Sequence, residues 1–308
     1  MTNLKIGTRG SPLALAQAYE TRRRLMEAHD IAEESIEIKV ISTEGDRIQD
    51  KALRDFGGKG LFTKEIELAL LDGSIDLAVH SMKDVQTQLV DELRIAAHLP
   101  REDVRDGFIS RTVKHLDELP EGAVLGTSSL RRQAQVKKRR PDLDVVTFRG
   151  SVQTRLEKLE RGEVAATFLA VAGLKRLGLT DELTTPIETD VMLPAVAQGA
   201  IGIECRTGDE RVEPLVAALN DRDTEICVTA ERAFLRKLDG SCRTPIAALG
   251  EIEGDSFKFR GQILAHDGSV AFSHERTGSL ETATRIGVEV AECLIEQAGP
   301  EFLASLVE

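Results

Sequence analysis

Three polar side chains with complementary chemistry follow a short apolar stretch. Residues 77–79 predict a buried strand, and Ser81, Lys83 and Asp84 come where that strand should end. In open α/β sheets, ligands bind beyond the carboxyl ends of the strands. A carboxylate placed there can move protons or stabilise a positive charge, while an ammonium and a hydroxyl can hold an anionic substrate. A solvated surface pair of Lys83 and Asp84 is the alternative interpretation.

The elements around this stretch predict a βαβαβ unit. Its expected strands are 4–6, 36–41 and 77–79, and its expected helices are 13–29 and 63–71. Ser11 is in the N-cap position of the first helix, so backbone N–H groups there would form an anion site beside Arg9. The polar, glycine-bearing stretch 43–60 predicts a long loop, in which Lys59 is a mobile cation between two glycines.

The same order of elements repeats further along the chain. The expected strands are 123–125, 145–148 and 164–170, and the expected helices are 130–138 and 155–160. Five arginines come just after these strands or in the first turns of the helices: Arg131, Arg132, Arg149, Arg155 and Arg176. Guanidinium groups bind carboxylates and phosphates bidentately, so this placement predicts a ligand with several such groups. Arginines that cap helices or pair on the surface are the alternative. No glycine-rich phosphate-binding motif is present, so a nucleotide is not indicated.

The last third of the chain predicts a smaller α+β domain. Residues 193–204 predict a connection and a strand that returns to the first unit. After them come an expected helix at 225–238, strands at 246–252, 257–266 and 270–275, and a helix at 280–297 that stops at Gly299 and Pro300. Cys242 lies in a glycine-bearing loop beside Arg243, where a thiolate is favoured. A loop cysteine without a role is the alternative.

Composition and charge limit the classes of protein to which the chain can belong. The net charge of −12 argues against a general nucleic-acid binder, because phosphate contacts need a basic face. The basic run 137–140 before Pro141 is interpreted as the cationic end of a helix rather than a nucleic-acid patch. The chain has no apolar stretch of signal-peptide or membrane-spanning length, which predicts a cytoplasmic protein without a membrane partner. The four cysteines include no CxxC pair, so neither a metal site nor a disulfide framework is expected.

Seven motifs taken in order resemble the porphobilinogen deaminase (hydroxymethylbilane synthase) family over essentially the whole chain. They are TRGSPLALAQ at 8–17, FGGKGLFTKEIE at 56–67, AVHSMKDV at 78–85, GTSSLRRQAQ at 126–135, RRPDL at 139–143, LAVAGLKRLG at 169–178 and the loop of Cys242. The resemblance implies an α/β fold of two periplasmic-binding-protein-like lobes and a small α+β C-terminal domain. The expected first lobe is 1–100 with 198–218, the second lobe is 101–197, and the third domain is 219–308.

The resemblance also implies an activity, a transferase of tetrapyrrole, porphyrin and heme biosynthesis. Such enzymes condense four porphobilinogen molecules head to tail with loss of ammonia on a covalently bound dipyrromethane, and then release the linear tetrapyrrole by hydrolysis. The family's cofactor-bearing cysteine corresponds to Cys242 and its catalytic carboxylate to Asp84. Asp84 would hydrogen-bond a pyrrole N–H, stabilise the cationic ring that forms on carbon–carbon bond formation, and help move protons.

Each pyrrole brings an acetate and a propionate, so the resemblance assigns the cations to binding carboxylates. The residues implied are Arg9, Lys83, Arg131, Arg132, Arg149, Arg155 and Arg176, assisted by Ser11, Ser81, Thr127, Ser128 and Ser129. Lys59 belongs to the glycine-rich loop that would cover the site. His80 is interpreted as a packed or hydrogen-bonded neighbour rather than a catalyst.

Three positions depart from the family pattern, and none of them removes an acid, a cysteine or an arginine. Gln86 stands where the family usually has proline, Ala197 replaces a common glycine, and Ser151 replaces an asparagine. Alanine would be strained at position 197 if that position needed a positive φ. The expected protein is therefore a monomeric enzyme acting on porphobilinogen. A two-lobed carboxylate-binding protein or sensor without catalysis is the rival interpretation, and a DNA-binding regulator is disfavoured because no helix-turn-helix precedes the lobes.

Overall fold

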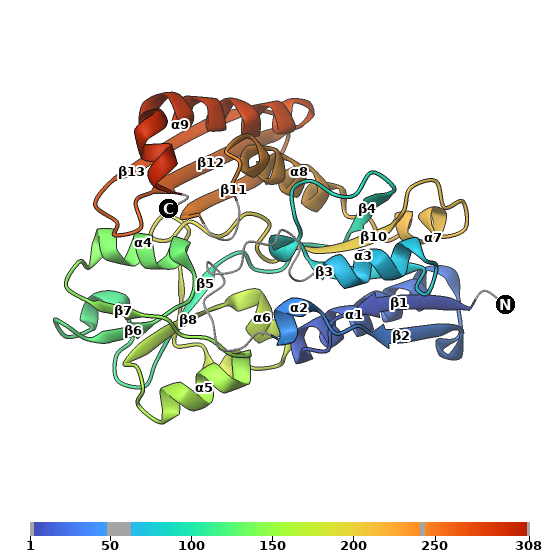
Figure 1. Cartoon of the computed structure of the whole chain (residues 1–308), viewed down its shortest axis with the longest axis horizontal. Coiled ribbons are helices and arrows are strands. Elements are labelled where there is room, and N and C mark those ends of the chain that lie inside the picture. Colours follow the sequence, from blue (N-terminus) through green and yellow to red (C-terminus); the bar gives the residue numbers. More distant parts are fainter. Residues whose placement is uncertain (1–2, 48–62, 241–243, 307–308) are drawn as a thin grey trace. The chain divides into compact units, whose positions relative to one another are not determined.

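The computed structural model describes residues 3–47, 63–240 and 244–306. The chain forms two compact units, of which one holds the described residues up to Glu102 together with Gly199–Glu225. The other unit holds Asp103–Gln198 and the described residues from Ile226 onward. Figure 1 shows the elements of both, coloured along the sequence. The α/β fold class is confirmed, because helices flank two five-stranded sheets and a smaller three-stranded sheet follows.

The first unit is built on a sheet of strand order β2-β1-β3-β10-β4. Its strands are β1 (Leu4–Thr8), β2 (Ile36–Val40), β3 (Leu77–Ser81), β4 (Leu93–His98) and β10 (Ile201–Arg206). β1 pairs in parallel with β2 and β3, and β10 runs antiparallel between β3 and β4. The expected return of a later strand to the first unit is confirmed by β10.

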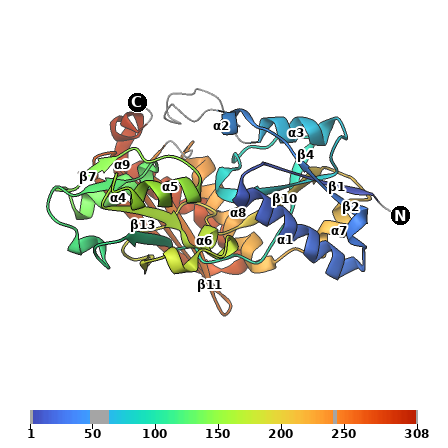
Figure 2. The same ribbon diagram turned by 90° about the horizontal axis from the view of Figure 1, so that it is seen from below.

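Helices cover both faces of this sheet. They are α1 (Pro12–His29), α2 (Glu44–Arg47), α3 (Lys64–Leu71) and α7 (Glu213–Ala217), with short 3₁₀ turns η1 (Glu33–Ser35) and η3 (Met82–Asp84). The side chains of β3 alternate, so that Leu77 and Val79 pack in the core with α1 while Ala78 packs with α3 on the other face. Figure 2 shows α1 and α3 on opposite sides of these strands.

The first helix begins where the sequence predicts. The Ser11 hydroxyl accepts a hydrogen bond from Ala14 N at 3.2 Å, and Pro12 occupies the first helical turn. The helix ends at Asp30, whose φ of 51° reverses the chain toward β2. Capping therefore sets both ends of α1 from local residues alone.

The second unit contains a sheet of order β7-β6-β8-β5-β9, which repeats the parallel and antiparallel pairings of the first. Its strands are β5 (Asp106–Ser110), β6 (Val124–Gly126), β7 (Asp144–Val146), β8 (Ala166–Ala170) and β9 (Thr185–Ile187). Its helices and 3₁₀ turns are α4 (Leu130–Arg139), α5 (Val152–Glu160), α6 (Val171–Arg176), η4 (Leu116–Glu118) and η5 (Thr180–Glu182). The predicted internal repeat is therefore present in the topology.

The same unit carries an antiparallel sheet of β11 (Ile246–Glu253), β12 (Ser256–Leu264) and β13 (Ala271–Ser279). It is accompanied by α8 (Arg222–Lys237), η6 (Leu280–Thr282) and α9 (Ala283–Ser305). The expected helix stop at Gly299 is a break rather than an end, since Gly299 has a φ of 73° and the chain resumes a helix as far as Ser305.

The turn between β12 and β13 lies against α4. A Cβ atom built on Gly268 would come within 2.4 Å of Lys138 N and 2.5 Å of Ala134 O. Only glycine allows the two backbones to approach this closely, and its φ of 73° also suits glycine. Backbone contact therefore holds the three-stranded sheet against the helix that carries Arg131 and Arg132.

Candidate active site

A small cavity in the first unit gathers several of the sequence-predicted residues. Its volume is about 60 Å³. It is lined by Arg9, Ser11, Leu13, Ala14, Gln17, Thr63, Val79, His80, Ser81 and Asp84. The loop between β1 and α1 therefore meets the end of β3 here, as the expected strand-end site requires.

Asp84 lies in the short turn η3, which is held in place by a backbone hydrogen bond and a buried side chain. Met82 N donates to Ala200 O at 3.0 Å, and the Met82 side chain is buried. Val85 N closes the turn on Met82 O at 3.3 Å. Lys83 and Asp84 consequently remain exposed, and Asp84 reaches the cavity while Lys83 is not among its lining residues.

The Ser81 side chain is oriented by Gln17, which was not among the predicted site residues. The Ser81 hydroxyl exchanges two hydrogen bonds with the Gln17 amide, accepting from Nε2 at 2.8 Å and donating to Oε1 at 3.1 Å. Gln17 is a buried polar residue on α1. Its place at the end of the motif 8–17 is the signal that could have found it.

Arg9 and Ser11, from the chain between β1 and α1, also line this cavity. Ser11 uses its hydroxyl to cap α1, so its contribution to an anion site comes through the N-terminus of that helix. The Arg9 guanidinium and the Asp84 carboxylate line the same cavity. This arrangement offers a positive group for a carboxylate and a negative group for an N–H donor within one small volume.

His80 is a hydrogen-bonded neighbour, as the sequence analysis expected. Its Nε2 lies 2.9 Å from Glu204 Oε2, and both side chains are buried. The partner on β10 was not identified from the sequence. It lies 124 positions away from His80 in the chain, so no local pattern joins the two.

In the second unit, two of the predicted arginines share one buried carboxylate. Arg132 donates from Nε and Nη2 to Asp106 Oδ1, and Arg131 Nη1 lies 2.8 Å from Asp106 Oδ2. Burial alone would raise the pKa of Asp106, but the two guanidinium charges outweigh it and hold this pKa well below its ordinary value. Burial lowers the pKa of Arg131 more than Asp106 raises it.

Arg149 and Arg155 add two positive charges to this cluster without adding a carboxylate. Arg149 Nη1 is buried and has no hydrogen-bond partner among the described residues. Arg155 Nε donates to Gly150 O at 3.0 Å. Burial, together with the charges of Arg132 and Arg149, lowers the pKa of Arg155 to about 10. Like charges held this close predict that an anion belongs beside them.

The predicted hydroxyls build the turn between β6 and α4. Ser128 Oγ donates to Phe148 O at 2.7 Å, and Ser129 Oγ accepts from Arg132 N at 3.4 Å as the N-cap of α4. Thr127 Oγ1 accepts from Ser129 N at 3.2 Å. Each hydroxyl oxygen thus shapes the loop that places Arg131 and Arg132.

The remaining predicted site residues are Arg176, Lys59 and Cys242. Arg176 is the last residue of α6, so the prediction that it directly follows a strand or lies in the first turn of a helix is wrong, because a helix forms between it and β8. Lys59 and Cys242 lie outside the described residues, so their predicted roles stay predictions.

The basic run 137–140 ends a helix, as the sequence analysis expected. α4 ends at Arg139, with Lys137 and Lys138 also in its last turn. Arg139 pairs with Asp117 and Arg140 with Asp142, so both cations already have carboxylate partners. The run therefore needs no nucleic acid to explain it.

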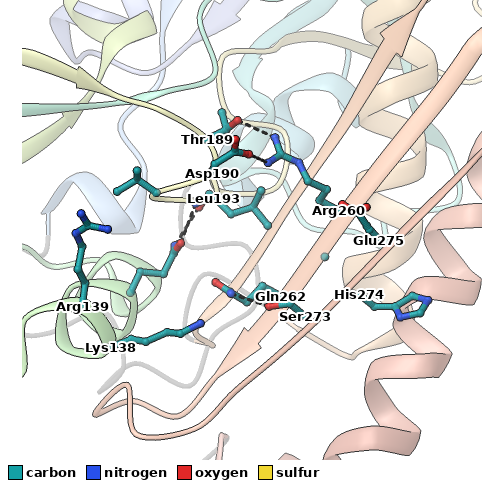
Figure 3. Close-up of a pocket in the computed structure, with 13 residues that line it drawn as sticks. Lys138, Arg139, Thr189, Asp190, Leu193, Arg260, Gln262, Ser273, His274 and Glu275 are labelled. Atoms are coloured by element: carbon teal, nitrogen blue, oxygen red, sulfur yellow. Dashed lines mark hydrogen bonds and ion pairs between the residues drawn. The ribbon is translucent and has the colours of Figure 1, made fainter.

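A larger cavity of about 510 Å³ lies in the second unit between α4 and the three-stranded sheet. Figure 3 shows Arg260 reaching toward Thr189 and Asp190, with Lys138 and Arg139 across the cavity. Arg260 pairs with Asp190 and with Glu251, so its charge is neutralised within the protein. In contrast, no ion pair between a described carboxylate and Arg149 or Arg155 is found.

Two further features bear on the kind of site. Among the described residues, no group of three or more His, Cys, Asp or Glu side chains is arranged to hold a metal ion. A search of the same residues finds no helix long and apolar enough to cross a membrane. The first unit therefore offers one exposed carboxylate with a hydroxyl and amide pair, and the second unit offers clustered arginines.

Comparison with known proteins gives this arrangement a family. Residues 4–214 match the model of the porphobilinogen deaminase dipyrromethane cofactor binding domain, and residues 225–296 match the porphobilinogen deaminase C-terminal domain. The porphobilinogen deaminase of Paracoccus denitrificans is 56% identical over 97% of this chain and 96% of its own length. That of Nitrobacter winogradskyi is 56% identical over 96% of this chain and 94% of its own length.

Solved structures match far more weakly. A nutrient-binding protein from Burkholderia cenocepacia bound to methionine aligns over 76% of this chain and 95% of its own, with 15% identity and a TM-score of 0.42. That similarity is too low to carry an argument. The matches to family models and curated relatives extend over nearly the whole sequence, and the chain therefore belongs to the porphobilinogen deaminase family.

Proposed function

We propose that this chain is a hydroxymethylbilane synthase, a transferase that joins four porphobilinogen molecules head to tail. Each condensation releases ammonia, growth takes place on a covalently bound dipyrromethane, and hydrolysis releases the linear tetrapyrrole. The observation that carries the proposal is the 56% identity to named porphobilinogen deaminases over nearly the full chain. The exposed Asp84 in the cavity with Arg9 supplies a physical basis for the chemistry.

The arginine cluster fits a group that carries several carboxylates. Among the described residues, Asp106 is the one carboxylate ion-paired with any of Arg131, Arg132, Arg149 and Arg155. The cluster therefore has an excess of positive charge, and a buried nitrogen of Arg149 lacks an acceptor. Acetate and propionate oxygens are suitable acceptors, since guanidinium groups bind carboxylates bidentately.

The bound dipyrromethane supplies the pyrrole end to which the first substrate is added. We propose that the cluster named above holds its carboxylates, with Arg176 and the hydroxyls of Thr127, Ser128 and Ser129 assisting. The proposed attachment is a thioether to Cys242, which lies outside the described residues. The matched cofactor-binding domain of the family supports the presence of this group.

Asp84 is the proposed catalytic carboxylate. Its side chain is exposed at the cavity, where it can accept a hydrogen bond from the substrate pyrrole N–H. The negative charge would also stabilise positive charge that develops on the ring when the carbon–carbon bond forms. Arg9 and Lys83 would hold the substrate carboxylates, and the Ser81 hydroxyl, fixed by Gln17, would give a further polar contact. Lys59 is proposed to act from a covering loop.

The proposed organisation has a first lobe of 1–100 with 198–218, a second lobe of 101–197 and a third domain of 219–308. The three sheets support this division. We further propose that the protein acts as a monomer in the cytoplasm. Sedimentation of the purified protein tests the first of these two statements, and fractionation of the source cells tests the second.

The intact mass of the purified protein tests the proposed function most directly. The expected mass exceeds that of the bare chain by two porphobilinogen units less two ammonia molecules, and a Cys242→Ser variant lacks this excess. Incubation of the loaded protein with porphobilinogen is expected to release the linear tetrapyrrole. A chain that stays unmodified and forms no product would instead favour the rival carboxylate-binding protein.

A further inference from the structure

A buried pair of titratable side chains lies behind the cavity. The side chains of His80 on β3 and Glu204 on β10 are 4% and 1% exposed, and His80 Nε2 lies 2.9 Å from Glu204 Oε2. The other carboxylate oxygen, Oε1, is buried and has no hydrogen-bond partner in the described part of the chain. An ionised carboxylate buried with an unsatisfied oxygen is unfavourable unless a positive charge lies beside it. The hydrogen bond with His80 is therefore the contact among the described residues that satisfies the Glu204 carboxylate.

Glu67 adds a second carboxylate to this buried group. It lies on α3, which packs on the same face of the sheet, and it is 9% exposed. Burial raises the pKa of Glu67, and the nearby charge of Glu204 raises it further. The hydrogen bond with Thr63 and the charge of His80 lower it, but the net shift is upward. The two carboxylates are thus electrostatically coupled, so that ionisation of one disfavours ionisation of the other.

The strand register explains why these groups meet. Glu204 lies opposite Ala78 and Gly202 lies opposite His80, so Glu204 and His80 are diagonal neighbours on one face. The Met82 side chain fills the space above Gly202, where any Cβ would collide with it. Met82 therefore closes the group at the end nearest the turn of Asp84.

The buried group of His80, Glu204 and Glu67 reaches the cavity of Asp84 through His80. His80 and Thr63 line the same cavity as Asp84 and Arg9. The cavity volume of about 60 Å³ exceeds the roughly 10–15 Å³ that one water molecule needs. Water therefore fits in the cavity that Asp84 and His80 both line, and such water can carry a proton between them.

We propose that His80 transfers protons during the condensation, with Glu204 and Glu67 as positioning residues that hold the proton at its ring. This proposal rests on the proposed function. In each condensation the C–N bond of an aminomethyl group breaks and a C–C bond to the next pyrrole forms. The ring carbon that forms this bond loses one proton, and departing ammonia gains one. His80 gives a proton by way of water to the departing ammonia and then takes back, by way of Asp84 and water, the proton that the ring carbon loses, so that protons and charge balance without a redox step.

In the described part of the chain, the charged and titratable groups around His80 come from several elements. Glu204 comes from β10 and Glu67 from α3, while Arg9 and Asp84 line the same cavity as His80. His98 of β4 lies opposite Gly202 in the same row of the sheet. Because Glu204 is the group in direct contact, its charge has the greatest effect on the protonated imidazole.

The test is the pH dependence of turnover in a Glu204→Gln variant. Glutamine keeps the size and a hydrogen-bonding group but removes the negative charge beside the imidazolium. The expected result is a kcat lower by about 10- to 100-fold with little change in KM. The alkaline limb of the kcat profile is expected to move to lower pH, because the protonated ring has lost its counter-ion.

Asp76→Asn is the matched control. Asp76 is 8% exposed, accepts from Lys5 N at 2.7 Å, and lies just before β3 at the strand end far from Asp84. Its replacement also removes a buried carboxylate from this unit, but without access to the cavity. The control is expected to lower stability and to leave the shape of the pH profile unchanged.

If the Glu204→Gln variant does not fold, a His80→Gln variant provides the second test. The glutamine side chain still fills the site of the imidazole, but it has no proton that titrates. This variant is expected to lose the alkaline limb altogether. A folded variant at either position with wild-type kcat and a wild-type profile would overturn the proposal and leave the proposed function intact. If the cofactor-loaded wild-type protein forms no tetrapyrrole, the proposed function itself has failed.

Discussion

Arg132 donates two hydrogen bonds to the same carboxylate oxygen, Asp106 Oδ1, from Nε at 3.0 Å and Nη2 at 2.6 Å. Asp106 is the first residue of β5, and Arg132 lies in the first turn of α4. The bonds thus join a strand to the helix that carries both Arg131 and Arg132. They hold these guanidinium groups in place before any ligand arrives.

Replacing Asp106 with asparagine is expected to destabilise the protein. The change leaves Arg131 and Arg132 buried without a counter-ion, and breaking a buried ion pair on one side lowers the free energy of unfolding by about 3–5 kcal/mol. Chemical denaturation followed by circular dichroism measures this. A loss below about 1 kcal/mol would show that water reaches the pair and shields it.

The pH dependence of the same pair gives a separate prediction. Because Arg131 and Arg132 hold the pKa of Asp106 below its ordinary value, the stabilisation is fully present above the unfolded value of about 3.9. It is lost as pH falls through the lower, folded value. The difference in unfolding free energy between wild type and Asp106→Asn is therefore expected to be constant above about pH 5 and to shrink below about pH 4. A difference that grows on acidification would contradict the assignment.

Arg149→Ala is expected to separate binding from stability. Removing the Arg149 charge relieves its repulsion with Arg155, so the free energy of unfolding should not fall. Loss of a carboxylate contact should instead lower kcat/KM for tetrapyrrole formation by about 10-fold or more. Denaturation and steady-state kinetics on the same preparation measure both. A folding defect with normal kcat/KM per folded molecule would make Arg149 structural.

Asp84→Ala is expected to keep the fold and abolish turnover. The side chain is exposed, so its removal should change the unfolding free energy by less than about 0.5 kcal/mol. Asp91→Ala is the matched control, since Asp91 is an exposed aspartate of the same unit and does not line the cavity. Product formation near the wild-type rate in the Asp84 variant would remove this residue from its proposed role.

Ala197 has a φ of 58°, the positive value at which alanine is strained. The left-handed conformation costs alanine about 1–2 kcal/mol, and the greater freedom of glycine in the unfolded chain offsets about 0.4–1 kcal/mol of that. Ala197→Gly is therefore expected to stabilise the protein by about 1 kcal/mol. Thermal unfolding with retained activity checks this, and a lower melting temperature would contradict it.

Interactions between residues close together in the sequence explain why much of the fold could be predicted. Ser11 caps α1, Ser129 caps α4 and Ser151 caps α5, each through an N–H three residues ahead. The repeat of strand, turn and helix likewise follows from local periodicity. Strands β4 (Leu93–His98), β5 and β9 were not predicted, because short strands whose burial depends on distant partners carry a weak periodic signal.

The sequence by itself determined the order of most elements, the N-caps of α1, α4 and α5, and the placement of Asp84, Arg131, Arg132, Arg149 and Arg155 at strand ends and helix starts. These depend on residues a few positions apart, whose periodicity and hydrogen bonding are local. Only the tertiary structure decided which side chains form hydrogen bonds with one another. Asp106 is separated from Arg132 by 26 positions, Gln17 from Ser81 by 64, and His80 from Glu204 by 124. No local period links such pairs, because sheet register and helix packing bring them together only when the whole unit folds.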